Sequence, residues 1–221
     1  MRKSATMPFA ALAAPRKSGP AHSAAKRGFD VVVAALSLLA LSPALLVIAL
    51  AIKLTSRGPV LFCQQRYGLN NEKFTIYKFR SMHIDSCDQK GVQQTRVADE
   101  RVTPVGKALR RFSLDELPQL INIVRGDMSL VGPRPHVPGM LAGGFLYEVL
   151  VPNYFERHIV KPGLTGLAQA RGLRGCTADA ERAKARIDQD LKYIENWSLA
   201  LDLRIIMETV RTEFLKAGNG I

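Results

Sequence analysis

The stretch VVVAALSLLALSPALLVIALAI, residues 31–52, is the longest apolar run of the chain. Basic residues border it on both sides, since Lys26 and Arg27 precede it and Lys53 and Arg57 follow it. At about 1.5 Å of rise per helical residue, such a run covers the roughly 30 Å hydrocarbon core of a bilayer. The run therefore predicts a helix that associates with a membrane.

Ser42 and Pro43 stand in the middle of this run. Proline removes a backbone donor, clashes with the carbonyl one turn earlier and disfavours helical geometry at the preceding residue. We therefore expect a kink or break there, with the Ser42 hydroxyl bonding backbone groups that a break would free. Basic flanks favour the cytoplasmic side, so a re-entrant helix-break-helix that enters and leaves through one leaflet satisfies both observations. The residues leave open a kinked helix that crosses the bilayer once.

The chain of 221 residues carries a net charge of +12. Half of this excess comes from the basic residues that precede Asp30, the first acidic residue: Arg2, Lys3, Arg16, Lys17, Lys26 and Arg27. Because the cluster adjoins the apolar run, the charge favours anionic lipids or phosphate-bearing ligands, and we expect no nucleic-acid partner. The three cysteines form no Cys-x-x-Cys pair, which favours a reducing cytoplasm over a disulfide framework or a zinc site.

Three parts follow from these patterns. Residues 1–25, rich in Ala, Pro, Ser and Lys, are predicted to be a flexible basic arm. Residues 26–57 form the membrane helix, and residues 58–221 form one modest domain. We expect a mixed α/β (α+β) fold: a small membrane-associated domain with a re-entrant helix, a short β-hairpin and amphipathic surface helices.

The hairpin is predicted from alternating apolar and polar residues. Residues 60–66 and residues 73–79 alternate in this way, and Gly68, Asn70 and Asn71 supply turn residues between them. These two segments are therefore expected to pair as antiparallel strands.

The segment SLDELPQL, residues 113–120, has the signature of a helix start. Ser113 and Glu116 have the spacing of a capping box, and the helix is expected to end at Gly126. Asp115 would then lie at the positive end of the helix dipole, which keeps its carboxylate ionised. Together, Asp115 and Glu116 offer a nucleophile and an anchor for Mg²⁺. An ordinary capped helix with acidic residues in its first turn fits the same spacing.

Cations near these carboxylates could bind an anionic substrate. Lys78 and Arg80 alternate to one face at the end of the second predicted strand, and Arg110 and Arg111 directly precede the acidic pair. Each of them could equally be a solvated surface charge.

Arg134 lies between two prolines, which fix the backbone around it. This rigidity reduces the entropy that its guanidinium loses when it grips a phosphate. A rigid turn with an incidental arginine remains an alternative.

Two helices are expected near the C-terminus. Ala183, Ile187, Leu191 and Ile194 lie on one face of the first helix. The second helix follows Ser198 and has its own apolar stripe: Leu203, Ile206, Val210 and Phe214. These stripes could pack on the domain core or lie in the lipid interface.

Residues 26–221 resemble the bacterial sugar transferases, monotopic polyprenyl-phosphate phosphoglycosyl transferases. The resemblance rests on a series of motifs in order: Lys26-Arg27, Leu41-Ser42-Pro43, Gly58-Pro59-Val60, Phe62-x-Gln64-x-Arg66-x-Gly68, Lys78-Phe79-Arg80-Ser81-Met82, Arg101-Val102-Thr103, SLDELPQL at 113–120, and Gly126-Asp127-Met128-Ser129-Leu130-Val131-Gly132-Pro133-Arg134-Pro135. The tail, with Lys161-Pro162-Gly163 and Asn196-Trp197-Ser198, is most similar to undecaprenyl-phosphate glucose phosphotransferases of exopolysaccharide synthesis. Longer relatives carry a further multi-helix membrane domain, in whose place this chain has the basic arm.

The resemblance implies a mechanism. Asp115 would attack the sugar-linked phosphorus of a UDP-sugar and release UMP, and Glu116 would hold Mg²⁺. Undecaprenyl phosphate would then take the hexose phosphate from the aspartyl intermediate.

The resemblance also assigns roles to other residues and a location to the protein. Lys78, Arg80 and Arg134 are implied to bind substrate, and Gln169 and Arg171 are weaker candidates for it. The implied location is the cytoplasmic face of the bacterial inner membrane, with a re-entrant helix in contact with its lipids.

Two other functions remain open from the residues. A membrane-anchored glycosyltransferase would release UDP instead of UMP, and a non-catalytic module that binds anionic lipids would tolerate loss of Asp115 and Glu116. The sequence leaves undecided which sugar is transferred, glucose or galactose, and which glycoconjugate pathway uses it. It also leaves open whether the protein is a homodimer.

Overall fold

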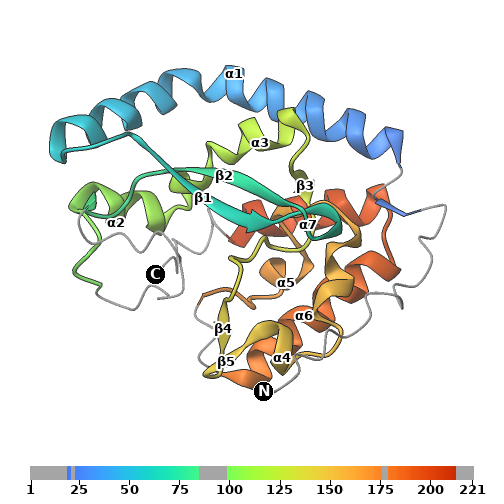
Figure 1. The fold of residues 1–221 in the computed structure, drawn as a ribbon. Helices are drawn as coiled ribbons and strands as arrows, with labels where there is room; N and C mark the ends of the chain where they lie inside the picture. Colours follow the sequence, from blue (N-terminus) through green and yellow to red (C-terminus); the bar gives the residue numbers. More distant parts are fainter. Residues whose placement is uncertain (1–18, 21–22, 85–98, 176–178, 213–221) are drawn as a thin grey trace.

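The computed structural model describes residues 19–20, 23–84, 99–175 and 179–212. Most of the predicted arm, residues 85–98 and Phe214 lie outside this range. Figure 1 shows one long helix, α1 (Ala24–Thr55), arching along one side of the molecule, with the remaining elements on the other side of it. All of the described domain therefore lies against a single face of α1.

The expected break in this helix is wrong. α1 is helical from Ala24 to Thr55 with Pro43 inside it, and the helix curves rather than breaks. The carbonyl that Pro43 cannot bond belongs to Leu39, and the Ser42 hydroxyl donates to that oxygen at 2.8 Å. Ser42 thus satisfies the backbone group that proline frees, as the sequence predicted, and the helix continues through it.

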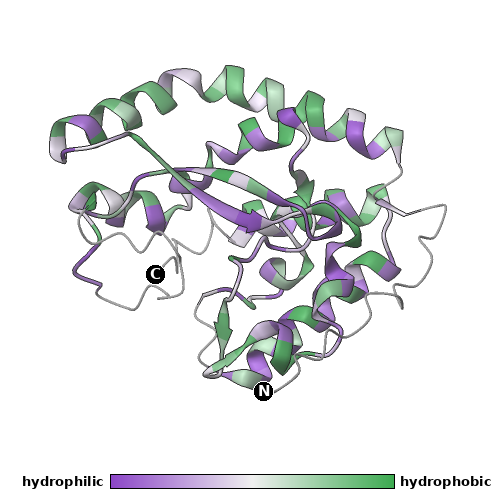
Figure 2. Ribbon diagram, in the orientation of Figure 1, coloured by the Kyte–Doolittle hydropathy of each residue, from purple (hydrophilic) through white to green (hydrophobic). Residues whose placement is uncertain are grey.

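The two sides of α1 differ in their surroundings. Ala34 and Ile52 are buried against the domain, near opposite ends of the helix. The outward side exposes a series of large apolar residues along the helix: Val32, Leu36, Leu39, Leu46, Val47, Leu50 and Leu54. Within the described residues, α1 is the one helix long and apolar enough to cross a membrane. Figure 2 shows this apolar character along most of its length.

The predicted hairpin is confirmed. β1 (Leu61–Tyr67) and β2 (Lys73–Phe79) pair antiparallel, with Gln64 opposite Ile76. Asn70 and Asn71 have φ values of 53° and 65°, in the left-handed region that asparagine tolerates, so the turn forms where the sequence placed it.

The segment after the hairpin contains four short elements. α2 (Pro104–Arg111) begins at Thr103, whose side chain accepts the Gly106 N–H. A 3₁₀ turn, η4 (Leu114–Glu116), leads to α3 (Gln119–Arg125), which ends at Gly126 with φ of 100° as predicted. β3 (Ser129–Val131) follows.

The next segment supplies a parallel partner for β3. Two short strands, β4 (Leu141–Ala142) and β5 (Phe145–Leu146), precede α4 (Tyr147–Leu150) and the 3₁₀ helix η5 (Tyr154–Ile159). β6 (Gly163–Thr165) then pairs parallel with β3. A Cβ on Gly163 would lie 2.1 Å from the Gly132 nitrogen, so only glycine permits this approach of the two backbones.

The C-terminal helices follow α5 (Leu167–Ala170). α6 (Ala180–Glu195) buries Ala183 and Ile187 in a cluster with Tyr147, so its stripe packs in the core. α7 (Leu199–Val210), capped by Ser198, buries Asp202 and Ile205 and leaves part of its predicted stripe exposed. Leu203 and Val210 are the exposed members of that stripe.

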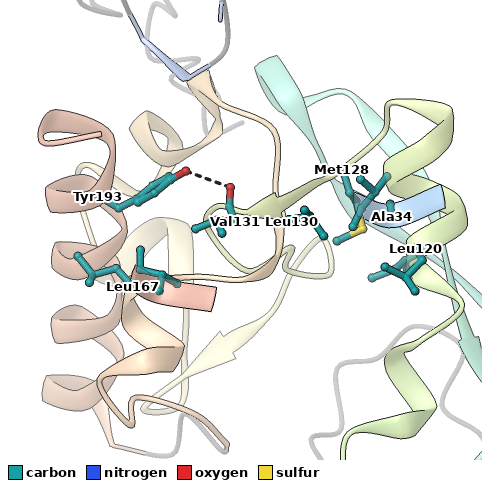
Figure 3. Packing of buried hydrophobic residues seen from close by; sticks show 10 residues of the cluster. Ala34, Leu120, Met128, Leu130, Val131, Leu167 and Tyr193 are labelled. Atoms are coloured by element: carbon teal, nitrogen blue, oxygen red, sulfur yellow. Dashed lines mark hydrogen bonds between the residues drawn. The ribbon is translucent and has the colours of Figure 1, made fainter. Parts of the chain in front are cut away.

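The main core lies where α1, α3, β3, α6 and α7 meet. Its buried members include Ala34, Leu120, Met128, Leu130 and Tyr193. Figure 3 shows these side chains on both sides of β3, with the Tyr193 hydroxyl donating to the Val131 carbonyl at 3.0 Å. A second core, formed by Ile52, Phe79 and Leu109, holds the other end of α1.

Candidate active site

The candidate site centres on the carboxylate of Glu116 in η4. Its Oε1 accepts from Lys78 Nζ at 2.7 Å and from Arg134 Nη2 at 2.6 Å, and its Oε2 accepts from Arg134 Nη1 at 3.2 Å. Lys78 comes from β2, and Arg134 follows β3 between two buried prolines. The structure therefore brings together three of the residues that the sequence singled out, from three separate elements.

Asp115 lies beside Glu116 and is buried. Burial and the negative charge of Glu116 raise its pKa above the ordinary value, and the charges of Lys78, Arg110 and Arg134 offset only part of that rise. The expected stabilisation by a helix dipole is therefore wrong. Asp115 sits in a single 3₁₀ turn, and the predicted helix does not begin until Gln119.

The capping box is also wrong. Ser113 has a left-handed backbone, with φ of 53°, and its side chain makes no capping hydrogen bond. Its carbonyl accepts the Glu116 N–H at 3.2 Å, and the Glu116 side chain turns to the two cations. The Glu116 side chain therefore binds the two cations and does not cap the helix.

Glu116 is fully ionised at neutral pH. Burial alone raises the pKa of a carboxyl, but the charges of Arg134 and Lys78 and their hydrogen bonds hold the pKa of Glu116 well below its ordinary value. The contact with Glu116, opposed by burial, raises the pKa of Arg134. Burial lowers the pKa of Lys78 even though the Glu116 charge acts the other way.

More cations surround this group. Burial and the nearby charge of Arg134 lower the pKa of Arg66 to about 10, and the same two causes lower the pKa of Arg174. The Arg66 Nε is buried and has no hydrogen-bond partner among the described residues. Arg110 acts on Asp115 by its charge and donates from Nε to Ser81 Oγ at 2.8 Å. Two carboxylates thus face at least five cations, which favours an anionic ligand with more than one phosphate.

A sequence profile of a family described as bacterial sugar transferase matches residues 21–216. The chain belongs to this family. Among bacterial sugar transferases, it is 54% identical over 195 residues to an exopolysaccharide production protein, PSS, of Rhizobium leguminosarum bv. phaseoli. That match covers 88% of this chain and 97% of the relative.

Two further relatives are longer than this sugar transferase. An undecaprenyl-phosphate glucose phosphotransferase of Komagataeibacter xylinus is 52% identical over 85% of this chain, which covers 35% of the relative. A UDP-glucose:undecaprenyl-phosphate glucose-1-phosphate transferase of Caulobacter vibrioides is 52% identical over 84% of this chain and 68% of its own length.

Arg80, expected in the sugar transferase's site, has other partners. Its Nη1 donates to the Arg57 carbonyl at 2.6 Å, and its Nη2 donates to the Ser56 carbonyl and hydroxyl at 2.8 Å each. These acceptors follow the end of α1, so Arg80 fixes that end of the helix on the hairpin. Gly58, next to these acceptors, has φ of 114°, a backbone conformation that favours glycine.

Gln169 and Arg171 do not contact the Glu116 group in the structure. Gln169 is buried on α5, where its Nε2 donates to the Leu164 carbonyl at 3.5 Å and its Oε1 has no partner among the described residues. Arg171 is exposed, and its Nη1 donates to Gln189 Oε1 on α6.

Sequence reasoning gave no role to Arg66 or Arg174. Arg66 stands in one of the motifs that carried the resemblance, so a signal for it existed. Arg174 had no such signal, because it interacts with the charge of Arg134 only in the folded chain.

The described residues contain no group of three or more His, Cys, Asp or Glu side chains suited to a metal ion. Asp115 and Glu116 nonetheless offer the donor set that Mg²⁺ uses, since this ion is commonly held by one or two carboxylates together with substrate phosphates and water. Burial and, after it, the charge of Glu116 raise the pKa of Asp115, and a divalent cation between the two carboxylates would offset their repulsion. The residues therefore fit Mg²⁺ bound together with a phosphorylated substrate.

Proposed function

We propose that this sugar transferase moves a hexose 1-phosphate, glucose 1-phosphate first of all, from a UDP-sugar to undecaprenyl phosphate. The observation that carries the proposal is a buried Asp115 next to Glu116, with Lys78 and Arg134 bound to the latter. A reactive carboxylate inside a cationic site suits an attack on a diphosphate. The names of the relatives support the choice of sugar and lipid.

The first step forms a covalent intermediate. An Asp115 oxygen attacks the phosphorus that carries the sugar, the bond from this phosphorus to the bridging oxygen breaks, and UMP leaves with that oxygen and its electron pair. The second step reverses the roles. An oxygen of undecaprenyl phosphate attacks the same phosphorus, and the Asp115 carboxylate leaves, which yields the lipid diphosphate sugar.

The surrounding residues act by charge and position. Lys78 and Arg134 can bind phosphoryl oxygens of the nucleotide sugar, and the prolines on either side of Arg134 fix its backbone. Arg66 adds a further positive charge to this group. Mg²⁺, held by Asp115 and Glu116 with the phosphates, would offset the charge on the transferring group. Because the pKa of Asp115 is raised, the rate is expected to fall with falling pH earlier than for an ordinary aspartate.

The membrane helix determines where this chemistry takes place. Both ends of α1 pack against one domain, through Ala34 in the first core and Ile52 in the second. This packing, together with the basic residues at both ends, supports a re-entrant arrangement with both flanks on the cytoplasmic face. The carboxylates would then lie close to the headgroup plane, where the lipid substrate presents its phosphate.

The test is to incubate the purified full chain with Mg²⁺, undecaprenyl phosphate and a panel of UDP-sugars, including UDP-glucose and UDP-galactose. The proposal predicts release of UMP with UDP-glucose, and none when UDP-glucose is left out. Release of UDP would identify a glycosyltransferase that moves only the sugar, and no nucleotide release with any donor would favour a module that binds lipid without catalysis.

A further inference from the structure

A second cationic group lies at the opposite end of α1 from the candidate active site. The site is linked to the C-terminal half of α1, because Leu114 packs in the same cluster as Ile52 and Phe79. The second group surrounds Lys26 and Arg27, roughly 40 Å of helix away. It lines an open cavity of about 100 Å³ whose other walls include Ser23, Ser129, Lys161 and Tyr193.

Most charges in this cavity are already paired. Lys26 donates to Asp202 Oδ2 at 2.7 Å and to the Val131 carbonyl at 3.1 Å. Asp30 accepts from the Ser129 hydroxyl at 2.7 Å and from the Leu130 N–H at 3.1 Å. These groups form a fixed internal network and leave little capacity for a ligand.

Arg27 and Lys161 differ from these paired groups because neither side chain has a carboxylate partner among the described residues. Arg27 donates to the carbonyls of Ile123 and Val124, at 2.6 and 2.9 Å, and forms no ion pair with a carboxylate of the described residues. Lys161 makes no hydrogen bond or ion pair within the described ranges. A Cβ built on Gly126 would lie 3.4 Å from Arg27 Nη2 and 3.6 Å from Lys161 Nζ, so both cationic heads flank one point.

This juxtaposition of like charges is unfavourable without an anion. Burial and the charge of Arg27 lower the pKa of Lys161, and the charges of Asp30 and Asp127 oppose this effect only in part. Asp127 is itself engaged, since it accepts from Asn122 Nδ2 at 3.1 Å. An ammonium and a guanidinium that share one open cavity match the oxygens of a phosphate.

We propose that this cavity binds the phosphate of an anionic phospholipid headgroup. The cavity lies where the outward face of α1 turns apolar, because Val32 is 56% exposed and Leu36 is 61% exposed one and two turns further along. In a bilayer that accepts this apolar face, lipid phosphates lie at the level of the cavity. Such a contact would fix the height of this end of α1 independently of the substrates.

The experiment uses the full chain in detergent micelles and counts bound lipids by native mass spectrometry. Phosphatidylglycerol and phosphatidylcholine are added at equal concentration, and inorganic phosphate is added as a competitor in a separate series. Wild-type protein is expected to retain more phosphatidylglycerol than phosphatidylcholine. Lys161→Gln is expected to weaken this binding roughly fivefold to tenfold, the effect of one basic residue near an anionic surface.

Two variants serve as controls. Lys161→Arg keeps the charge and is expected to retain the lipid, and Lys184→Gln removes an exposed lysine of α6 and is expected to have no effect. Equal lipid binding by Lys161→Gln and Lys184→Gln would overturn the proposal. Displacement of the lipid by millimolar inorganic phosphate would show a site for free phosphate and would overturn the assignment to a lipid headgroup.

Discussion

Replacement of Glu116 by glutamine tests whether this carboxylate holds the site together. Glu116→Gln keeps the size and one acceptor oxygen but removes the charge that Lys78 and Arg134 share. Removal of one partner from a buried ion pair costs about 3–5 kcal/mol, because the other charge stays buried and unpaired. The side chains of Lys78 and Glu116 are 16% and 14% exposed, and that of Arg134 is 36% exposed. Because the Arg134 side chain is partly exposed to water, we expect Glu116→Gln to lower the free energy of unfolding by a smaller amount, about 2–3 kcal/mol.

The loss can be measured as a fall in melting temperature. For a chain of this size, it corresponds to about 4–12 °C, which thermal unfolding in detergent micelles resolves. Addition of UMP is expected to restore part of the loss, because its phosphate replaces the missing negative charge.

A matched control is available on the surface. Glu181 forms an ion pair with Lys184 at 2.8 Å, and its side chain is 81% exposed, so Glu181→Gln is expected to change stability by less than about 0.5 kcal/mol. If Glu116→Gln melts at the same temperature as Glu181→Gln, the charge balance inferred for the site is refuted.

Three further predictions concern the rest of the molecule. Burial and the charge of Arg157 lower the pKa of His158 to about 3. As the pH falls below about 6.5, His158 therefore binds a proton in the unfolded chain but stays neutral in the folded chain. Stability should therefore fall by up to about 1.4 kcal/mol per pH unit as the pH drops from about 6.5 towards 3, and His158→Gln should flatten this slope in melting curves. Asp202→Asn should cost about 3–5 kcal/mol because Lys26 stays buried, and a second change, Lys26→Met, should recover much of it; additive losses in this double-mutant cycle would contradict the pairing. Pro43→Ala should let α1 cross the bilayer in part of the molecules, so that cysteine labelling finds one flank protected; if both flanks still react from the cytoplasmic side, proline does not decide the topology.

Local patterns in the sequence predicted much of the fold. The hairpin follows from alternation in residues 60–66 and 73–79, and the end of α3 follows from Gly126. The start of α7 follows from Ser198, whose side chain accepts the Leu201 N–H. Each of these features depends on residues close together in the chain, which is why pattern and propensity suffice for them.

The features that local patterns missed depend on contacts and burial that only the folded chain creates. The parallel pairing of β6 with β3 has no local signal in the sequence, because it depends on Gly132 and Gly163, which allow two distant backbones to approach closely. The spacing of Arg80 from Lys78 did not indicate its partners in the fold, which are carbonyl groups that follow α1. The sequence predicts that a helix dipole stabilises the Asp115 carboxylate, whereas burial and the charge of Glu116 raise its pKa.

The most direct test of the central claim is the mass of the protein after reaction without a lipid acceptor. Full-length enzyme is incubated with UDP-glucose and Mg²⁺ alone, quenched and digested, and the peptide that contains Asp115 is analysed by mass spectrometry. The account predicts about one UMP per enzyme and one hexose phosphate on Asp115, both absent in Asp115→Asn. UMP release without a covalent adduct, or an adduct at another residue, would contradict it.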